Sequence, residues 1–434
     1  RDFAGLAGAE RRILEAYAAG VNAHLARVRD GEVASPLVLR NQGQALALVR
    51  TDTIGIWQDM VVDVQRRLRE EGRPDLADGL LVAATHTHSS GGRVFDHEIG
   101  EIAVGTFLPA FYERVRNSIV EAVLSADANA VEAEVGHHEL QVPELHKDRR
   151  CENADVQDDT MGLIKVVRAD GSLLALVVNY AMHGTVLGTD DWTLSRDASG
   201  AIEHGIESRL PEQATVLYLQ SWAGDMAPST PTSVVIGDGN DLRDAFRSLD
   251  AIGAAAAAVV LPALDDIETS PDAEVGVHTV AVPVVNQEVN PDGVFDEYPY
   301  GGIYCLDSDE NCGEDAAPYG PADLACLPID ESFTVPHTLL TAARIGNLGL
   351  STLPGEPVTS VGTELRERVA QATGWSSVFV VGYAQSYLSY LLHPDDYWMG
   401  GYEGASGLFG PGFGVFLIDR AEAVAALVEK AKAM

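Results

Sequence analysis

The chain has 434 residues, with 65 acidic and 29 basic side chains and a formal net charge of −36 at pH 7. Hydrophobic residues make up 46% of it and charged residues 22%, a composition typical of globular proteins, which excludes a disordered or fibrous chain. The negative net charge and the lack of a basic cluster exclude nucleic-acid binding. The longest uncharged apolar stretch, Ala251–Leu264, is shorter than the roughly 20 residues that a membrane span needs, so no membrane span is predicted.

The first predicted elements lead to a pair of histidines. Residues 35–50 contain two short apolar runs around a glycine and predict a hairpin, and a helix is expected over Trp57–Glu71. Gly79–Ala84 is a fully apolar strand that runs directly into His86 and His88. Polar side chains therefore begin where this predicted strand stops.

Four further apolar strands deliver polar side chains in the same way. Residues 162–178 predict a second hairpin, whose second strand runs into His183. The strands 216–219 and 348–353 run into Asp225 and Glu356, and the strand 378–382 leads to a group of tyrosines. Strand ends that carry His, Asp, Glu and Tyr predict one sheet edge with a polar cleft, where α/β proteins bind their ligands.

This pattern predicts an α/β fold with a mixed β-sheet core, surrounding helices and an active site at the strand ends. The helices are expected over Asp241–Asp265, Pro357–Thr373 and Phe416–Met434. No internal repeat or low-complexity linker divides the chain, so residues 1–434 are expected to form a single domain. The irregular stretch rich in Asp, Gly and Pro at about 286–330 is interpreted as an insertion or lid.

The four cysteines predict disulfides rather than a metal site. Cys305, Cys312 and Cys326 lie in the irregular stretch, Cys151 lies apart from them, and no CxxC pair is present. An even number of such cysteines indicates two bridges, with three possible pairings left open. Together with the acidic surface, this indicates a secreted or periplasmic protein.

His86, His88, His183 and Glu356 form a candidate zinc site. In an extended segment, residues two apart face the same way, so His86 and His88 can converge on one cation. Two or three imidazoles and a carboxylate, with one position left for water, are typical of catalytic zinc. The alternatives are a buried structural histidine at 183 and a carboxylate at 356 that caps the following helix. The HExxH, GxSxG, Walker and GxGxxG motifs are absent.

Five motifs, in order along about 320 residues, resemble those of the neutral, non-lysosomal ceramidase family of zinc amidases. They are Ala84-Thr-His-Thr-His-Ser89, Asn179-Tyr-Ala-Met-His-Gly-Thr185, Ser195-Arg-Asp197 with Gly200, Leu353-Pro-Gly-Glu356, and Tyr387-Leu-Ser-Tyr390 followed by Tyr397 and Tyr402-Glu-Gly-Ala-Ser406.

The resemblance implies particular roles for these side chains. One Zn²⁺ would be held by His86, His183, Glu356 and Tyr390, with His88 in the pocket. Tyr402 would polarise the scissile carbonyl, and Arg149 would help hold polar groups of the substrate. Packing of the core is the alternative for the tyrosines, and it is the interpretation preferred for Tyr387 and Tyr397.

The chain departs from the family pattern at a serine to which the family gives a catalytic role. Ala227 occupies this position in Gly224-Asp-Met-Ala-Pro228, and the neighbouring Ser221 and Ser229 are displaced from it. Metal-activated water needs no protein nucleophile, so hydrolysis remains open, with Asp225 orienting or deprotonating water, whereas cleavage of ceramide itself is doubtful. The family's C-terminal immunoglobulin-like domain is also expected to be absent.

The acidic loop Asp307–Glu314 offers alternating oxygen donors for a structural Ca²⁺. Its glycine is one position late for an EF-hand, so a solvated loop tied by a disulfide is the preferred interpretation.

Taken together, the sequence predicts a secreted or periplasmic zinc-dependent hydrolase that cuts an amide bond in an N-acyl, lipid-like substrate. The alternatives are an esterase or lactonase on the same scaffold and an inactive relative that only binds a ligand. The sequence leaves the acyl length and the oligomeric state open.

Overall fold

The computed structural model describes residues 34–41, 43–96, 101, 104–150, 158–188, 194–211, 214–231, 242–285, 287, 289–290, 298, 300–306, 326–329 and 336–432. Within this part, three larger sheets have the strand orders β1-β2-β3, β4-β6-β7-β8 and β10-β13-β14-β16. Their strands are β1 (Ala34–Asn41), β2 (Gln44–Thr51), β3 (Leu80–Ala84), β4 (Ala133–Gln141), β6 (Thr160–Arg168), β7 (Leu173–Tyr180), β8 (Thr215–Gln220), β10 (Val275–Pro283), β13 (His337–Ile345), β14 (Leu348–Thr352) and β16 (Ser377–Val381).

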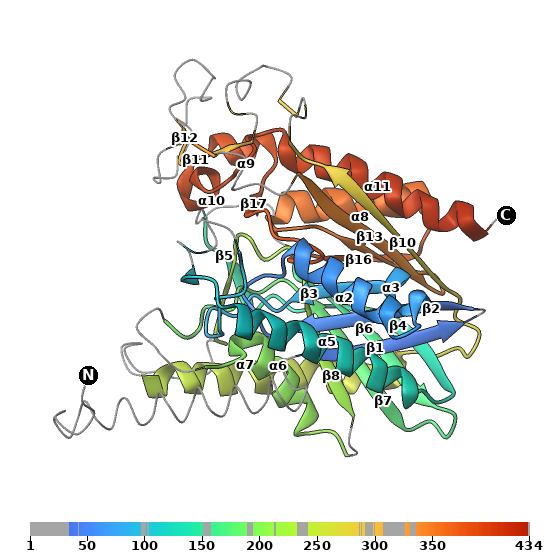
Figure 1. The fold of residues 1–434 in the computed structure, drawn as a ribbon. Helices are drawn as coiled ribbons and strands as arrows, with labels where there is room; N and C mark the ends of the chain where they lie inside the picture. Colours follow the sequence, from blue (N-terminus) through green and yellow to red (C-terminus); the bar gives the residue numbers. More distant parts are fainter. Residues whose placement is uncertain are drawn as a thin grey trace, which may run out of the picture.

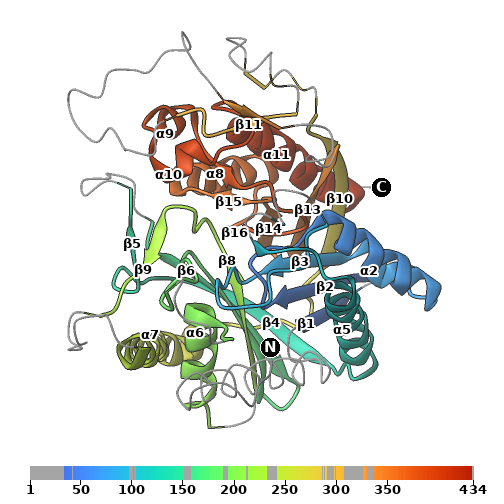
Figure 2. The same cartoon turned by 60° about the vertical axis from the view of Figure 1, so that its left-hand side comes forward.

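Helices cover the outer face of each sheet, as Figures 1 and 2 show: α2 and α5 lie on the first sheet, α6 and α7 on the second, and α8 and α11 on the third. The described helices are α2 (Gln58–Glu70), α3 (Pro74–Asp78), α5 (Pro109–Ala128), α6 (Asp197–Glu207), α7 (Leu242–Ala263) with the 3₁₀ turn η2 (Leu264–Asp266), α8 (Thr359–Thr373), α9 (Pro394–Trp398), α10 (Gly401–Ala405) and α11 (Phe413–Lys432).

The inner faces of the three sheets meet in one apolar core. Leu46 and Leu81 come to this core from the first sheet, Val177 from the second, and Leu350 and Phe379 from the third. Strand β3 is buried at every residue because helices cover one of its faces and this core covers the other. This double burial explains why β3 is a continuous apolar run instead of an alternating one.

Each large sheet is mixed and contains one parallel pair. The parallel pairs are β2 with β3, β7 with β8, and β14 with β16, and the remaining neighbours run antiparallel. The predicted α/β fold with a mixed sheet core and surrounding helices is therefore confirmed. The predicted hairpins and helices are also present, whereas α5, α6, β4, β10 and β13 were not anticipated.

Three two-stranded pairings connect the loops beyond the strand ends. They are β5 (His146–Asp148) with β9 (Met226–Pro228), β11 (Gly302–Ile303) with β12 (Leu327–Pro328), and β15 (Glu356–Pro357) with β17 (Tyr390–Leu391). The third of these places Glu356 directly beside Tyr390 in parallel register.

Leu242–Asp266 is the one described helical stretch that is long and apolar enough to cross a membrane. Half of it is buried, and α7 packs with α6 against the second sheet. Since the core helix of a soluble protein has the same properties, this stretch alone is weak support for a membrane span.

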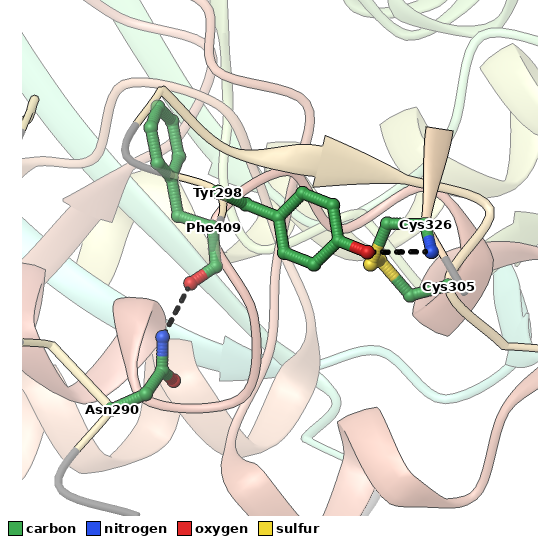
Figure 3. Close-up of a disulfide and its surroundings, with 5 residues drawn as sticks. All are labelled: Asn290, Tyr298, Cys305, Cys326 and Phe409. Atoms are coloured by element: carbon green, nitrogen blue, oxygen red, sulfur yellow. Dashed lines mark hydrogen bonds between the residues drawn. A yellow bond between two sulfur atoms is a disulfide. The ribbon is translucent and has the colours of Figure 1, made fainter. Parts of the chain in front are cut away.

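A disulfide joins Cys305 and Cys326 next to β11 and β12, so one of the predicted bridges is present (Figure 3). The hydroxyl group of Tyr298 accepts a hydrogen bond from the backbone N–H of Cys326 at 3.2 Å. The remaining cysteines, Cys151 and Cys312, lie outside the described residues, as do the candidate calcium loop and most of the predicted lid.

Candidate functional site

The carboxyl ends of the three parallel pairs meet at one place, but they come from three separate sheets instead of the one sheet edge that the sequence predicts. Strand β3 leads to His86, β7 to His183 and β14 to Glu356. The loops after β3 and β7 are joined by a parallel bridge between Thr87 and Gly184. A side chain at Gly184 would put its Cβ 2.5 Å from the carbonyl oxygen of His86, so only glycine lets the two loops approach this closely.

Three histidines form a compact cluster at this point. The Nε2 atom of His86 lies 3.0 Å from that of His183 and 3.1 Å from that of His88. His86 and His183 are buried, whereas His88 is exposed to solvent. Within the described part of the chain, these residues form the histidine cluster with the spacing of a metal site.

The backbone fixes how the two buried rings present their nitrogens. Nδ1 of His86 lies 2.6 Å from the carbonyl oxygen of Ile54, and Nδ1 of His183 lies 2.9 Å from that of Ala223. A carbonyl oxygen only accepts, so both Nδ1 atoms carry a proton and, in neutral rings, both Nε2 atoms present lone pairs. Two lone pairs facing each other at 3.0 Å repel, and a cation between them removes the repulsion. The donor set therefore fits a metal ion.

Glu356 completes the cluster with a carboxylate. Its Oε2 atom lies 3.2 Å from Nε2 of His86 and 3.7 Å from Nε2 of His183, and the residue is buried. Burial alone would raise its pKa, but His86, His183 and a hydrogen bond from Tyr387 outweigh burial and hold the pKa well below the usual value. An ionised carboxylate beside two imidazoles strengthens the fit to a cation.

The alternative role of Glu356 as a helix cap is not observed. Helix α8 begins at Thr359, and its first turn receives the side chain of Asp225 instead. The carboxylate of Glu356 contacts two tyrosines: the Tyr387 hydroxyl donates a hydrogen bond to Oε1, and the Tyr383 hydroxyl makes a longer and weaker contact of 3.4 Å with Oε2. Tyr387 thus has a polar contact beyond the packing role that the sequence suggested.

Tyr390 lies beside Glu356 through the pairing of β15 with β17. Its hydroxyl oxygen accepts a hydrogen bond of 2.8 Å from Nη2 of Arg149, and its ring is buried. Burial and then the charge of Glu356 raise the pKa of Tyr390 well above its usual value, while Arg149 acts in the opposite direction. The guanidinium is the nearby group that favours an ionised phenol.

Arg149 is held in place by Glu403, a residue for which the sequence predicts no role. Its Nε donates to Oε1 of Glu403 at 2.7 Å, and its Nη2 also donates to the carbonyl oxygen of Gly224 at 2.8 Å. Glu403 is buried in helix α10. The sequence signal that could have found Glu403 is a single carboxylate among small residues in Gly401-Tyr-Glu-Gly-Ala405. Such a carboxylate needs a charged partner if the segment is buried.

Tyr402 is the exposed tyrosine of the site. Its side chain lies on α10 with 59% of its surface accessible, and its ring centroid is 5.6 Å from that of Tyr390. The backbone N–H of Tyr304, next to the disulfide, donates to the carbonyl oxygen of Ala405 at 2.7 Å and so braces α10. Tyr402 is thus an exposed residue next to the buried Tyr390.

Asp225 contacts the start of helix α8 rather than the histidines in the described part of the chain. Both of its carboxylate oxygens lie 3.0 Å from the backbone N–H of Thr359, and Oδ1 also accepts from the hydroxyl of that residue at 2.9 Å. Burial, together with the neighbouring Asp148, raises the pKa of Asp225 to about 7. These contacts place the carboxylate where it supports the loop that carries Glu356.

Ala227 and the nearby serines considered in its place lie on and beside strand β9. Ala227 pairs with Lys147 of β5. Ser221 is buried, and its hydroxyl donates to the carbonyl oxygen of Val380 at 3.1 Å, while the backbone of Ser229 donates to Leu145. The hydroxyl of Ser221 is therefore engaged in joining two sheets.

Backbone strain is concentrated at the site. His86, Tyr383, Gln385 and Ser389 all have positive φ angles, between 52° and 65°, although none is glycine. Such conformations cost on the order of 1–3 kcal/mol each and persist where the surrounding structure enforces them. Four of them within the loops that carry His86 and the tyrosines indicate a geometry maintained for function.

Comparison with known proteins places these features in a family. The family described as "Neutral/alkaline non-lysosomal ceramidase, N-terminal" matches residues 32–244 and 329–414. The neutral ceramidase of Mycobacterium tuberculosis is 26% identical over 409 residues, covering 81% of this chain and 64% of the relative. That of Pseudomonas aeruginosa is 23% identical over 430 residues, covering 85% of this chain and 62% of the relative.

The crystal structure of neutral ceramidase from P. aeruginosa has the same fold, with a TM-score of 0.79 and 20% identity over 92% of this chain and 69% of that chain. The chain thus spans somewhat less than two thirds of the length of both curated relatives. Because the two matched ranges make up more than half of the chain, it belongs to the neutral/alkaline non-lysosomal ceramidase family.

Proposed function

We propose that the chain is a zinc-dependent hydrolase that cleaves the amide bond of an N-acyl, lipid-like substrate. One observation carries the proposal. The Nε2 atoms of His86 and His183 lie 3.0 Å apart, each with its lone pair toward the other, beside the ionised carboxylate of Glu356. The names of the relatives support an amide substrate, because each is a neutral ceramidase. Residues 1–434 are proposed to act as one catalytic domain, since the three sheets share a core.

His86, His183, Glu356 and Tyr390 would hold the zinc ion. When bound, zinc supplies a Lewis acid that activates water and polarises a carbonyl group. The carbonyl groups of Ile54 and Ala223 keep both imidazoles in the tautomer that a metal requires. Arg149 would stabilise the ionised oxygen of Tyr390, to which it donates a hydrogen bond.

Tyr402 and His88 would act on the substrate itself. Tyr402 is exposed, and its hydroxyl can donate to the carbonyl oxygen as negative charge develops there. The exposed ring of His88 lies beside His86 and can hydrogen-bond to the substrate or to the attacking water. Arg149, anchored by Glu403, would in addition bind polar groups of the substrate.

A protein nucleophile plays no part in this proposal. Ala227 has no hydroxyl group, and that of Ser221 is bonded to the carbonyl oxygen of Val380. We assign Asp225 to the support of helix α8, because its carboxylate is bound to Thr359 rather than directed at the cluster. The disulfide supports an oxidising location, secreted or periplasmic.

Metal analysis tests the proposal first. The purified chain should contain one zinc per molecule, and His183→Ala should abolish stoichiometric binding. His278→Ala is the matched control, because His278 is a partly buried histidine on β10, outside the cluster, and this variant should keep its zinc. A folded wild-type chain that binds no zinc would refute the enzyme proposal and favour the alternative of a ligand-binding protein.

The substrate class needs a second measurement. The zinc-loaded protein should hydrolyse N-acyl amides from a panel that also contains N-acyl amino acids, esters, lactones and ceramide. Turnover of esters or lactones without any amide hydrolysis would refute the amidase assignment while keeping the metal centre. Rapid turnover of ceramide would show that the alanine at 227 does not restrict the substrate.

A further inference from the structure

Gln220, at the end of β8, is a buried glutamine that connects the residues before the two buried histidines. Its Nε2 donates to the carbonyl oxygen of Met182 at 2.7 Å and to that of Thr85 at 3.2 Å. Its Oε1 accepts from the backbone N–H of Met182 at 3.1 Å. The hydroxyl oxygen of Tyr218 lies 3.1 Å from the same Oε1, but its proton is donated to the carbonyl oxygen of Tyr180 at 2.6 Å. Met182 and Thr85 directly precede His183 and His86 in the chain.

Three hydrogen bonds fix the orientation of this carboxamide. Both of its N–H donors have a carbonyl oxygen as partner, and its oxygen accepts from the backbone N–H of Met182. The reverse orientation would aim the NH₂ group at the N–H of Met182 and the oxygen at two carbonyl groups. Gln220 has no accessible surface, so water cannot replace a lost partner.

The backbone of Gln220 reaches the third sheet as well. Its carbonyl oxygen accepts a hydrogen bond of 3.1 Å from the N–H of Gly382. Gly382 precedes Tyr383, whose hydroxyl lies 3.4 Å from Oε2 of Glu356. One residue is therefore linked to the loop of each histidine and to the tyrosine that contacts the carboxylate.

We propose that Gln220 is a positioning residue of the metal centre, which sets the distance between the backbones of His86 and His183. This inference rests on the proposed function, since it assumes that the histidines bind the ion. The two histidines follow strands of different sheets, and their Nε2 atoms lie 3.0 Å apart. The side chain of Gln220 bonds to both Thr85 and Met182, the residues before the two histidines. These hydrogen bonds restrain the distance between the two backbones more directly than the surrounding apolar core does.

A purely structural amide is the competing interpretation, and Asn179 provides the comparison. It is a buried amide on β7 whose Nδ2 donates to the carbonyl oxygens of Leu219 and Val380, at 3.2 and 3.0 Å. It joins the second and third sheets but bonds to neither residue before a histidine. Loss of Asn179 should thus lower stability without a specific effect on the metal.

The experiment compares Gln220→Met, Gln220→Glu and Asn179→Leu with the wild type. Zinc dissociation constants are measured by competition with a chelator at 10 °C, after circular dichroism has shown that each variant is folded. The absorption spectrum of the Co²⁺-substituted protein reports the ligand geometry. Both Gln220 variants should raise the dissociation constant roughly 10- to 100-fold and change the cobalt spectrum, as expected for a partner that orients metal ligands. Asn179→Leu should leave both readouts unchanged.

Gln220→Glu keeps the size of the side chain and one acceptor, so it decides the matter if the methionine variant does not fold. Wild-type affinity and spectrum in a folded Gln220 variant would overturn the inference, as would an equal loss in Asn179→Leu. Failure of both Gln220 variants to fold would also overturn it, because the residue would then serve the fold as a whole. A wild-type chain without zinc binding would instead refute the proposed function.

Discussion

Removal of one hydroxyl group, in Tyr387→Phe, tests how the carboxylate of the site is held. The hydroxyl of Tyr387 donates to Oε1 of Glu356, and the other oxygen of this carboxylate faces His86. The ring of Tyr387 also stacks against Phe95, with centroids 6.1 Å apart. Phenylalanine keeps this stacking, so the substitution removes the hydrogen bond and little else.

The expected magnitude follows from the burial and charge of Glu356. A hydrogen bond to a charged group contributes about 1.5–3 kcal/mol, and about 1.4 kcal/mol corresponds to a factor of ten in affinity. Without zinc, the carboxyl group can respond to the loss by taking up a proton, but zinc binding requires the ionised form. Tyr387→Phe should therefore weaken zinc binding roughly 10- to 100-fold, within the range known for residues that orient metal ligands.

Tyr383→Phe is the matched variant, because the hydroxyl of Tyr383 lies 3.4 Å from Oε2, beyond the usual length of an O–H···O bond. It should reduce the affinity by less than about fivefold, on the scale of a weak hydrogen bond. The assay is chelator competition at pH 8 with thermal unfolding recorded in parallel. Equal effects of the two variants, or unchanged affinity in Tyr387→Phe, would refute the assignment of the first hydroxyl as the main support of Glu356.

Three further predictions concern the surroundings of the site. Burial, together with Asp148, raises the pKa of Asp225 to about 7, above the value of about 3.9 in an unfolded chain. This difference in pKa favours folding below about pH 4, and the contribution to stability is lost as the pH rises to about 7. Asp225→Asn should accordingly gain stability relative to the wild type at pH 8 but not at pH 4, measured by urea unfolding, and a difference independent of pH would contradict this. Glu403→Gln removes the charge that anchors Arg149, so kcat should fall at least about tenfold while metal analysis still finds one zinc, and an unchanged kcat would exclude this role. Cys326→Ser should lower the free energy of unfolding by about 2–4 kcal/mol without loss of zinc, and release of the metal on reduction would disprove the independence of bridge and site.

The apolar strands that run into polar residues were predictable from the sequence. Strands β3 and β14 are short and fully buried. His86 follows two residues after the end of β3 and Glu356 four residues after the end of β14, a pattern that is visible in the order of residues alone. The family motifs predict His86, His183 and Glu356 as ligands as well, and add Tyr390 in place of His88. The elements that were missed, such as α5 and β4, have mixed composition and depend on the sheets against which they pack.

The relations across sheets were decided by the tertiary structure. The sequence named His86, His183 and Glu356, but their spacing follows from three parallel pairs in three separate sheets whose carboxyl ends point to one place. The partners of these residues, such as Tyr387 for Glu356 and Gln220 for the two histidine loops, lie far from them in the chain. No local pattern encodes such contacts.

The sequence by itself therefore determined which side chains are candidates for the chemistry, because apolar runs and polar strand ends are properties of neighbouring residues. Only the folded chain decided which of them share hydrogen bonds, which tautomer each imidazole adopts, and that Asp225 serves a helix. The physical reason is that desolvation and hydrogen bonding act between groups close in space, and these groups become neighbours only after the three sheets have packed around their common core.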